Sequence, residues 1–273
     1  MSRSHGPAPA VSCAMPEGAR LRVDAGTAGE EARAQALVAR RGLRVVSWNV
    51  HQCVGVDRRY APERIARVLT ELAPDIVGLQ EVDTGKPPYE ALHQLDYIAR
   101  ATGMAAAAGF NIRHPKRDYG NALLSRFPLR AVRRIDLSAP RFEPRGALDV
   151  ELDWLDGPLR VAVTHLGLNA KERRFQTGRL GRALAAHEAG APTLLLGDFN
   201  EWFPNLTVRL AAMTAGFPSE FAGRSFPAPA PFLALDRIYA RPVPATADFR
   251  VWRRWPAPIA SDHLPLVLDL AWG

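Results

Sequence analysis

The stretch Thr193–Asn200 reads TLLLGDFN and places three consecutive leucines directly before Gly197, Asp198 and Asn200. An apolar run of this length, bounded by turn-forming residues, predicts a buried β-strand. The polar residues then stand at the carboxyl end of that strand, where α/β proteins gather ligands and catalytic groups. The segment therefore predicts a buried sheet that carries functional groups at one end of its strands.

Five further segments bring a polar residue to the end of an apolar run. In four of them the polar residue ends the run: Val45–Asn49, Ile76–Glu81, Val161–His165 and Leu233–Asp236. In the fifth, Ser261–Leu270, the polar residues come before the run. Taken singly, each polar residue fits a turn, a helix cap or a hydrogen-bonded core histidine. Taken together they would bury several carboxylates, which is costly unless a cation compensates them. The set therefore favours one functional site over six unrelated turns.

The rest of the chain alternates strand and helix patterns. Strands are expected at 43–49, 75–80, 120–125, 147–152, 159–164, 193–196, 235–240 and 264–270, and helices at 63–73, 89–102 and 171–189. This order predicts one α/β domain over 43–273, with mixed sheets and helices outside them. Residues 1–42 are rich in Ala, Gly, Pro and Arg, and we expect a poorly ordered extension there.

The composition excludes several classes of protein. Of 273 residues, 47% are hydrophobic and 23% are charged, which excludes a mainly disordered, collagen-like or coiled-coil chain. No apolar run approaches the roughly 20 residues that span a bilayer, and no signal peptide is recognisable. Cys13 and Cys53 are the only cysteines. They provide no disulfide framework, so we expect a cytoplasmic protein without a transmembrane segment.

The positive charge rests on arginine. The chain carries 35 Lys+Arg against 28 Asp+Glu, a net charge of +7, and only Lys86, Lys116 and Lys171 are lysines. The guanidinium group of arginine can donate two parallel hydrogen bonds to a phosphate. The coding bias of a GC-rich genome would produce the same arginine-rich composition. Beside an acidic predicted site, attraction of an anionic phosphate becomes the favoured explanation.

The motifs occur in an order that resembles the endonuclease/exonuclease/phosphatase superfamily. They are Ser47–Val50 (SWNV), Leu79–Asp83 (LQEVD), Gly120–Pro128 (GNALLSRFP), Thr164–Leu166 (THL), Gly197–Asn200 (GDFN), Leu235–Tyr239 (LDRIY) and Ser261–Pro265 (SDHLP). The resemblance implies a four-layer α/β sandwich of the DNase I type, with two packed mixed β-sheets flanked by helices. It also implies a hydrolase that cleaves phosphoester bonds with Mg²⁺ or Mn²⁺.

The resemblance further implies roles for ten residues. Asn49, Glu81 and Asp262 are expected to bind the metal, and Asp198 and Asn200 to orient the attacking water. His263 paired with Asp236 is the expected acid–base group, although Asp198 is the alternative acceptor of the water's proton. His165 is expected to donate to a non-bridging phosphate oxygen. Asn121 and Arg145 are the candidate contacts to substrate phosphate.

The sequence leaves three functions open. The leading hypothesis is a phosphodiesterase or phosphatase acting on a small or lipid-linked phosphoester, such as a phospholipid head group. The motifs look closest to a sphingomyelinase-like bacterial branch, because His165 stands where apurinic endonucleases usually carry tyrosine. A nuclease acting on DNA or RNA is second. An inactive binding module is third, since none of the six main motif residues is lost. The loop Phe226–Phe232 is either a stiff connector or a wall of the site.

Overall fold

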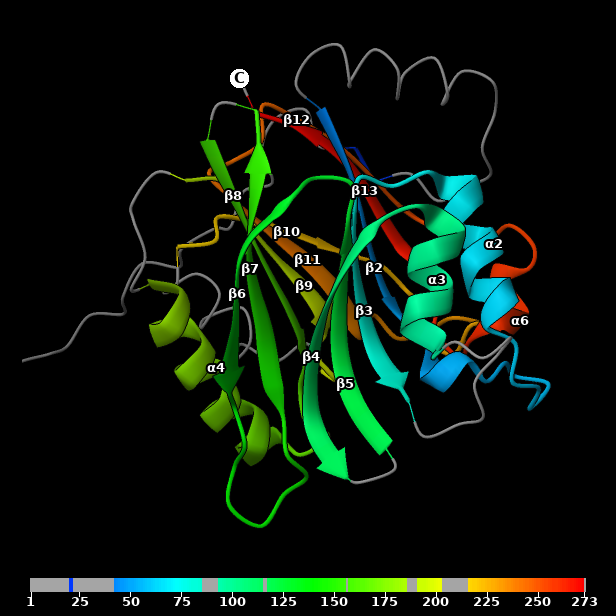
Figure 1. Cartoon of the computed structure of the whole chain (residues 1–273). Helices are drawn as coiled ribbons and strands as arrows, with labels where there is room; N and C mark the ends of the chain where they lie inside the picture. The colour runs from blue at the N-terminus through cyan, green and yellow to red at the C-terminus, as the bar shows by residue number, and fades with distance from the viewer. Residues whose placement is uncertain are drawn as a thin grey trace, which may run out of the picture.

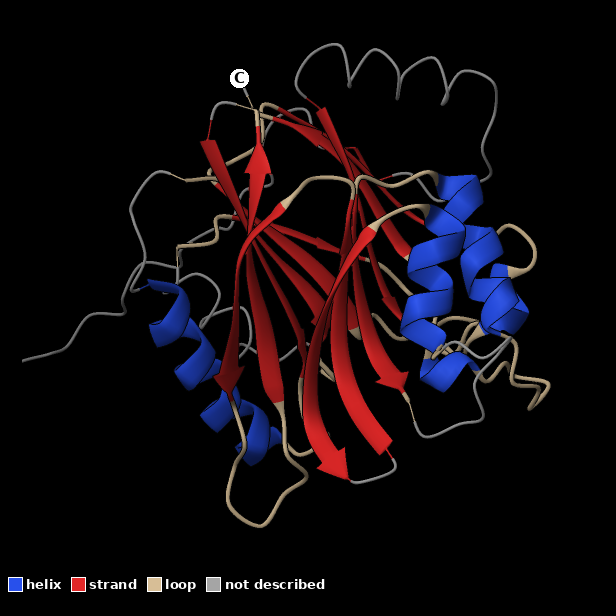
Figure 2. Ribbon diagram, viewed as in Figure 1, coloured by secondary structure: helices blue, strands red, loops and turns tan. Residues whose placement is uncertain are grey.

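The computed structural model describes residues 20–21, 42–84, 93–114, 117–155, 157–185, 191–202 and 216–272. Two β-sheets pack face to face, and helices cover the outer face of each sheet (Figures 1 and 2). This arrangement gives four layers and confirms the predicted α/β sandwich of the DNase I type. Among the described helices, none has the length and apolar character needed to cross a bilayer.

The first sheet has seven strands in the order β1-β12-β13-β2-β3-β5-β4. Their bounds are β1 Arg20–Leu21, β12 Thr246–Val251, β13 Leu266–Ala271, β2 Gly42–Asn49, β3 Ile76–Asp83, β5 Arg117–Ser125 and β4 Ala105–His114. The pairs β1/β12 and β2/β3 are parallel and the others are antiparallel, so the sheet is mixed as predicted.

The second sheet has six strands in the order β10-β11-β9-β8-β7-β6. Their bounds are β10 Ser219–Ala222, β11 Asp236–Arg241, β9 Thr193–Asp198, β8 Gly157–His165, β7 Gly146–Trp154 and β6 Leu129–Asp136. The only parallel pair among these described strands is β8/β9, and that pair ends in His165 and Asp198. The parallel pairs β2/β3 and β8/β9 therefore carry four residues of the predicted site, Asn49, Glu81, His165 and Asp198.

The helices lie outside the sheets. α2 (Pro62–Leu72), α3 (Gln94–Thr102) and the short α6 (Ala257–Ala260) lie on the side of the first sheet, and α4 (Ala170–Ala185) lies on the side of the second (Figure 1). The helix expected at 89–102 begins at Gln94, because His93 has extended backbone angles. Residues 89–92 and 186–189 of the expected helices lie outside the described residues.

The core fills the space between the sheets with aliphatic side chains. Val45, Leu79, Val163 and Leu196 are completely buried, as expected for strands covered on both faces. Gly78 brings the two sheets into close contact, because a Cβ atom there would lie 2.9 Å from a Leu196 methyl carbon. Close packing of this kind holds the ends of the facing strands in fixed positions.

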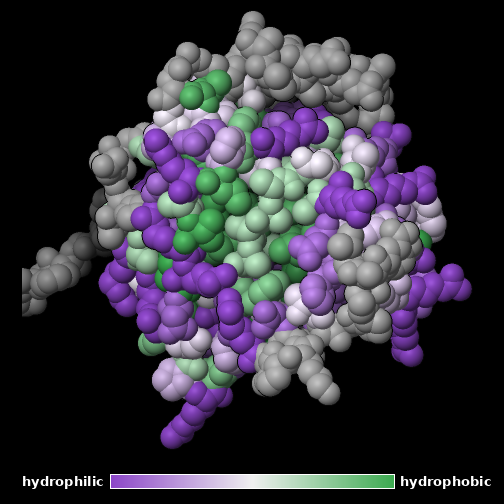
Figure 3. Space-filling model, viewed as in Figure 1, coloured by the Kyte–Doolittle hydropathy of each residue, from purple (hydrophilic) through white to green (hydrophobic). Residues whose placement is uncertain are grey.

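Five strands of the two sheets were missed by the sequence analysis: β1, β4, β6, β10 and β12. β4 opens with four alanines and β6 carries three arginines, and neither composition is typical of a strand. Both lie at sheet edges, where Arg134 of β6 donates to the carbonyl oxygen of Ala108 at 2.9 Å. Apolar residues gather in the middle of the face that Figure 3 draws. On β6, Val132 is 45% exposed.

The predicted extension 1–42 lies outside the described residues except for Arg20–Leu21 and Gly42. Arg20 and Leu21 form β1, which pairs in parallel with Asp248 and Phe249 of β12. This short pairing adds the outermost strand to the first sheet. Gly42 opens β2, one residue before the predicted start of the domain.

Candidate active site

The strand register brings three of the predicted residues side by side. His165 at the end of β8 pairs with Asp198 at the end of the parallel strand β9. Asp198 in turn pairs with Asp236, the first residue of the antiparallel strand β11. Asp236 therefore opens a strand, whereas the sequence pattern placed it at the end of one. Because β11 runs in the opposite direction, its first residue reaches the same edge of the sheet.

Glu81 is turned toward this edge by a break in the pairing of β3. The register of β3 against β5 shifts between Leu79 and Val82, and Glu81 has φ +60°. A bulge with a non-glycine residue in the left-handed region is uncommon, and it re-aims a side chain. Asn49 donates to the Glu81 carboxylate at 2.9 Å. The sequence singled out Glu81 as a candidate but contained no signal for the bulge.

Tyr119 is a neighbour of Glu81 that the sequence analysis missed. It lies on β5 opposite Asp83, and its phenol hydrogen-bonds to the Glu81 carboxylate. Burial, and then the negative charge of Glu81, raise the pKa of Tyr119. The phenol therefore stays protonated and donates to Glu81. Its place beside the motif that contains Asn121 was the signal that could have identified it.

Asn49 joins the two sheets. Its Nδ2 donates to Oε1 of Glu81 at 2.9 Å and to Oδ2 of Asp198 at 3.1 Å. Its Oδ1 accepts from the backbone N–H of His51 at 3.0 Å, and its carbonyl oxygen accepts from Ser261 Oγ at 2.7 Å. One buried amide thus holds carboxylates from β3 and β9 close together, as the grouping of these motifs predicted.

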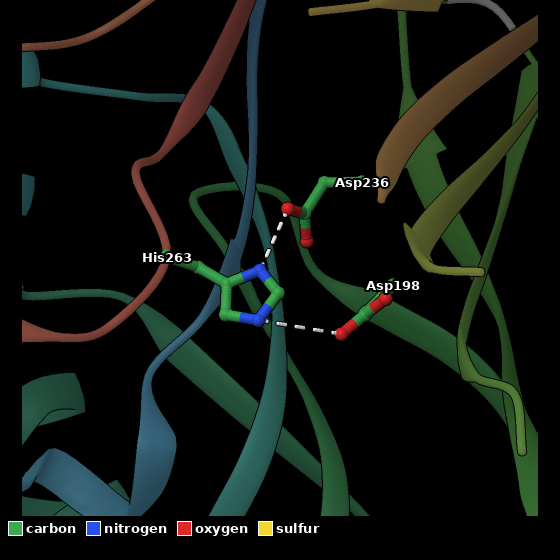
Figure 4. Close-up of side chains that lie close together, drawn as sticks. All are labelled: Asp198, Asp236 and His263. Carbon is green, nitrogen blue, oxygen red and sulfur yellow. Dashed lines mark hydrogen bonds and ion pairs between the residues drawn. The ribbon is translucent and has the colours of Figure 1, made fainter. Parts of the chain in front are cut away.

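His263 stands between two carboxylates (Figure 4). Its Nδ1 lies 2.8 Å from Asp236 Oδ2, and its Nε2 lies 3.7 Å from Asp198 Oδ2. Burial alone would lower the pKa of His263, but the charges of Asp236 and Asp198 outweigh it and raise the pKa to about 10. Ser225 Oγ also donates to Asp236. Ser225 lies in a loop without a recognisable pattern, so sequence reasoning missed it.

His165 has the opposite electrostatic environment. Arg145 Nη1 lies 3.3 Å from its Nδ1, and Asn200 Nδ2 lies 3.0 Å from its Nε2. Burial lowers the pKa of His165 to about 3, and the positive charge of Arg145 opposes the effect of Asp198. Arg145 donates to Nδ1, so the neutral ring carries its one N–H at Nε2, which also lies 3.6 Å from Asp198 Oδ2. A second proton at Nδ1 would point at the guanidinium. His165 is therefore neutral over the physiological pH range.

Asn200 holds Asp198 in a tight turn. The backbone N–H of Asn200 donates to Asp198 Oδ1 at 2.9 Å, and Asn200 has φ +51°. Asparagine tolerates this left-handed conformation better than most residues. Its Nδ2 also donates to the carbonyl oxygen of Leu166 at 2.9 Å. The sequence pair Asp198 and Asn200 is thus an Asx turn and part of the site at once.

Three other predicted residues lie at the border of this cluster. Arg145 pairs with Glu143 at 3.2 Å, and its buried Nε has no hydrogen-bond partner among the described residues. Asn121 Nδ2 donates to the Gly146 carbonyl oxygen at 3.0 Å, so Asn121 offers an acceptor instead of a donor in this orientation. Asp262 is one-third exposed and lies 3.9 Å from His51 Nδ1.

Among the described residues, only histidines lie within ion-pair distance of the acidic side chains of the site. Arginines pair with carboxylates at many other places, including Arg44–Asp269, Arg64–Asp57, Arg160–Asp149, Arg237–Glu220 and Arg250–Asp269. Among the described residues, no arginine or lysine forms an ion pair with Glu81, Asp198, Asp236 or Asp262. Carboxylate and amide oxygens are ligands that Mg²⁺ and Mn²⁺ accept.

The geometry also defines a second group that could hold a metal ion. Ligand atoms of Asp198, Asp236 and His263 all lie within 4.8 Å of one another. However, His263 has a carboxylate near each ring nitrogen, and its raised pKa keeps the ring protonated. A protonated imidazole has no lone pair for a metal. The oxygen donors around Glu81 and Asn49 therefore fit a hard cation better than His263 does.

An α/β sandwich of this type, with carboxylates and histidines gathered at one end, defines the class of DNase I-like proteins. The model of the Endonuclease/Exonuclease/phosphatase family matches residues 46–263. The chain belongs to this family, whose members are generally hydrolases.

Several known proteins are similar to the chain. The uncharacterised protein YbhP of Escherichia coli K12 is 29% identical over 249 residues, which cover 84% of this chain and 96% of YbhP. A family member from Beutenbergia cavernae has a similar structure, with a TM-score of 0.68 and 24% identity. The match covers 86% of this chain and 72% of the chain from Beutenbergia cavernae. A mannosyl-6-phosphatase of Bacteroides thetaiotaomicron gives a TM-score of 0.68 with 18% identity over 84% of this chain and all of its own.

Proposed function

We propose that the protein hydrolyses phosphoester bonds with the help of Mg²⁺ or Mn²⁺, and that its substrate is a small or lipid-linked phosphoester. One observation carries the proposal: four clustered carboxylates, Glu81, Asp198, Asp236 and Asp262, have no arginine or lysine partner among the described residues, and the protonated His263 balances only one of their charges. Such a cluster is costly to bury unless a cation joins it. The phosphatase among the similar structures supports the same reaction class.

The metal would be held by Glu81 with Asn49, and by Asp262 at the border of the site. These residues offer oxygen ligands, which suit a hard cation. When bound, such an ion polarises a phosphoryl oxygen and offsets negative charge on the substrate. The hydrogen bond from Tyr119 fixes the Glu81 carboxylate in place.

The proton of the attacking water would pass to Asp198, because the ring of His263 is already protonated. Asp236 holds Nδ1 of His263 at 2.8 Å and so fixes the orientation of the ring. The Nε2 atom then faces Asp198, which Asn200 holds through its backbone N–H. Asp198 and Asn200 would orient the water, Asp198 would accept its proton, and the protonated His263, held by Asp236, would give a proton to the leaving oxygen.

The phosphate would meet neutral and positive donors on the other side of Asp198. His165 is neutral, so its one N–H donates to a non-bridging oxygen without competing for the metal. Arg145 contacts His165 and Glu143, and its guanidinium is the candidate positive donor to the phosphate. Asn121 contributes a donor only if its amide turns away from Gly146.

A substrate panel tests the proposal. Plasmid DNA, an abasic duplex, RNA, phosphoinositides, sphingomyelin and bis-p-nitrophenyl phosphate are each incubated with Mg²⁺, Mn²⁺ or excess chelator. We expect metal-dependent release of product from the small or lipid-linked esters. Cleavage of the nucleic acids alone would replace this proposal with the nuclease. Activity that survives the chelator would contradict the role of a metal.

Matched variants separate the site from general effects of charge. Glu81→Gln removes one proposed ligand, and we expect it to raise the Mg²⁺ concentration needed for half-maximal activity by roughly 10- to 100-fold. Asp153→Asn removes an exposed carboxylate that pairs with Arg130 at 3.3 Å. That control should leave the dependence on Mg²⁺ unchanged. Equal shifts in both variants would argue against a metal at Glu81.

A further inference from the structure

Two aromatic residues form a wall beside His263. The ring of Phe226 lies against the imidazole of His263, with centroids 4.8 Å apart and planes inclined by 47°. Trp202 packs against Phe226 at 6.4 Å and 57°. The indole is 47% exposed. The aromatic wall, Phe226 with Trp202, thus runs from the buried imidazole out to solvent.

The loop that carries Phe226 is fixed by hydrogen bonds on both sides. The backbone N–H groups of Ser225 and Phe226 both donate to the carbonyl oxygen of Leu233, at 2.9 and 3.2 Å. Ala228 N donates to the Asp262 carbonyl oxygen at 2.7 Å. The loop Phe226–Phe232 is therefore more than a connector, because it holds its first ring at a defined place beside the catalytic candidates.

The exposure of Trp202 contrasts with that of its neighbours. Asn200 and Glu201, which directly precede it, are 5% and 4% exposed. The indole therefore leaves the buried turn and presents aromatic surface next to the site. Aromatic rings prefer offset-stacked or edge-to-face contacts with other rings, and these contacts add attraction beyond the burial of apolar area. An aliphatic group would gain only the burial.

We propose that Phe226 and Trp202 form a subsite for a planar aromatic ring carried on the ester group of the phosphoester substrate. This inference rests on the proposed function and makes its substrate class more specific. The phosphate binds at His165 and Arg145, and the ring on its ester group lies against the aromatic wall. Trp202 supplies most of the contact, because Phe226 is already covered by Trp202 and His263.

Binding of two non-hydrolysable phosphonates tests the subsite. Benzylphosphonate and cyclohexylmethylphosphonate carry the same charge and a six-membered ring of similar size, but only the first ring is aromatic. In calorimetric titrations with Mg²⁺ present, we expect the wild-type protein to bind benzylphosphonate about two- to tenfold more tightly. Trp202→Ala should bring this ratio to about one, and Trp202→Phe should keep part of it.

Leu155→Ala is the matched control. Leu155 is 55% exposed in the turn between β7 and β8, at the end of β8 opposite to His165. Its loss removes exposed apolar surface far from the wall, so the ratio should stay at its wild-type value. A ratio of one in the wild type, a ratio that survives Trp202→Ala, or no binding of either phosphonate would each overturn the subsite.

Turnover of benzyl and ethyl phosphate esters separates the two proposals. If the wild type shows the phosphonate preference but hydrolyses no ester, the proposed function fails and the subsite stands. If it hydrolyses the esters without preferring the benzyl compounds, the subsite fails and the function stands. Preference for the cyclohexylmethyl ring would replace the aromatic substituent with an aliphatic one.

Discussion

The pair formed by His263 and Asp236 should make the stability of the metal-free protein fall as the pH rises. The pKa of His263 is raised from 6.5 to about 10 in the folded protein. Folded protein then binds one more proton than unfolded protein between these two values. The stabilising contribution is complete below pH 6.5 and is lost as the pH rises through about 10.

The size of this effect follows from the same values. One extra proton in the folded state makes the free energy of unfolding fall by about 1.4 kcal/mol per pH unit, or about 5 kcal/mol over the whole interval. Asp236→Asn keeps the shape of the side chain but removes the nearer charge. The more distant Asp198, at 3.7 Å from Nε2, remains. We therefore expect the variant to lose more than half of the pH dependence.

Guanidinium denaturation with excess chelator measures this difference at intervals from pH 6 to pH 10.5. Other titrating groups contribute equally to both proteins, so the difference between the two curves isolates the pair. His263→Gln removes the titrating group itself and should abolish the whole of this pH dependence. If Asp236→Asn lost stability as steeply with pH as the wild type, Asp236 could not be the source of the raised pKa.

Three further predictions concern the site and the fold. His263→Ala and Asp198→Ala should each remove most metal-dependent activity while unfolding stays cooperative, as a substrate assay and a melting curve together show. Arg145→Met should raise the pKa of His165 above about 3, although burial keeps it under 6.5, and NMR titration of the ring measures this. Asp149→Asn should lower the free energy of unfolding by about 3–5 kcal/mol, because Arg160, with Nε 2.7 Å from Asp149, becomes an unpaired buried charge. Denaturation at neutral pH checks the last prediction, with the exposed Asp153→Asn expected to cost less than about 1 kcal/mol.

The sequence predicted the parts of the site that depend on local pattern. Apolar runs indicate which strands are buried, and the residue that follows each run must lie at the end of its strand. Asn49, Glu81, His165 and Asp198 follow directly from this rule. The structure brings these side chains together as the motifs indicated.

The missing parts depend on contacts between distant segments. Tyr119 meets Glu81 because the register of β3 against β5 shifts at a bulge, and no local pattern encodes that shift. Ser225 reaches Asp236 from a loop 11 residues earlier. The edge strands β4 and β6 were missed because an edge strand is covered less completely and tolerates alanine and arginine. Strand composition alone therefore underestimates the width of both sheets.

The abundance of arginine now has a structural explanation beside phosphate attraction. Arg160 forms two hydrogen bonds to Asp149, at 2.7 and 2.8 Å, and also donates to the Leu184 carbonyl oxygen at 3.1 Å. A lysine ammonium cannot reproduce this planar pair of contacts. Arginine thus neutralises buried carboxylates outside the site, where neutrality stabilises the fold. Inside the site the carboxylates are held by neutral amide, phenol and hydroxyl donors and by His263. That division leaves a net negative charge at the site, which the proposed metal ion would balance.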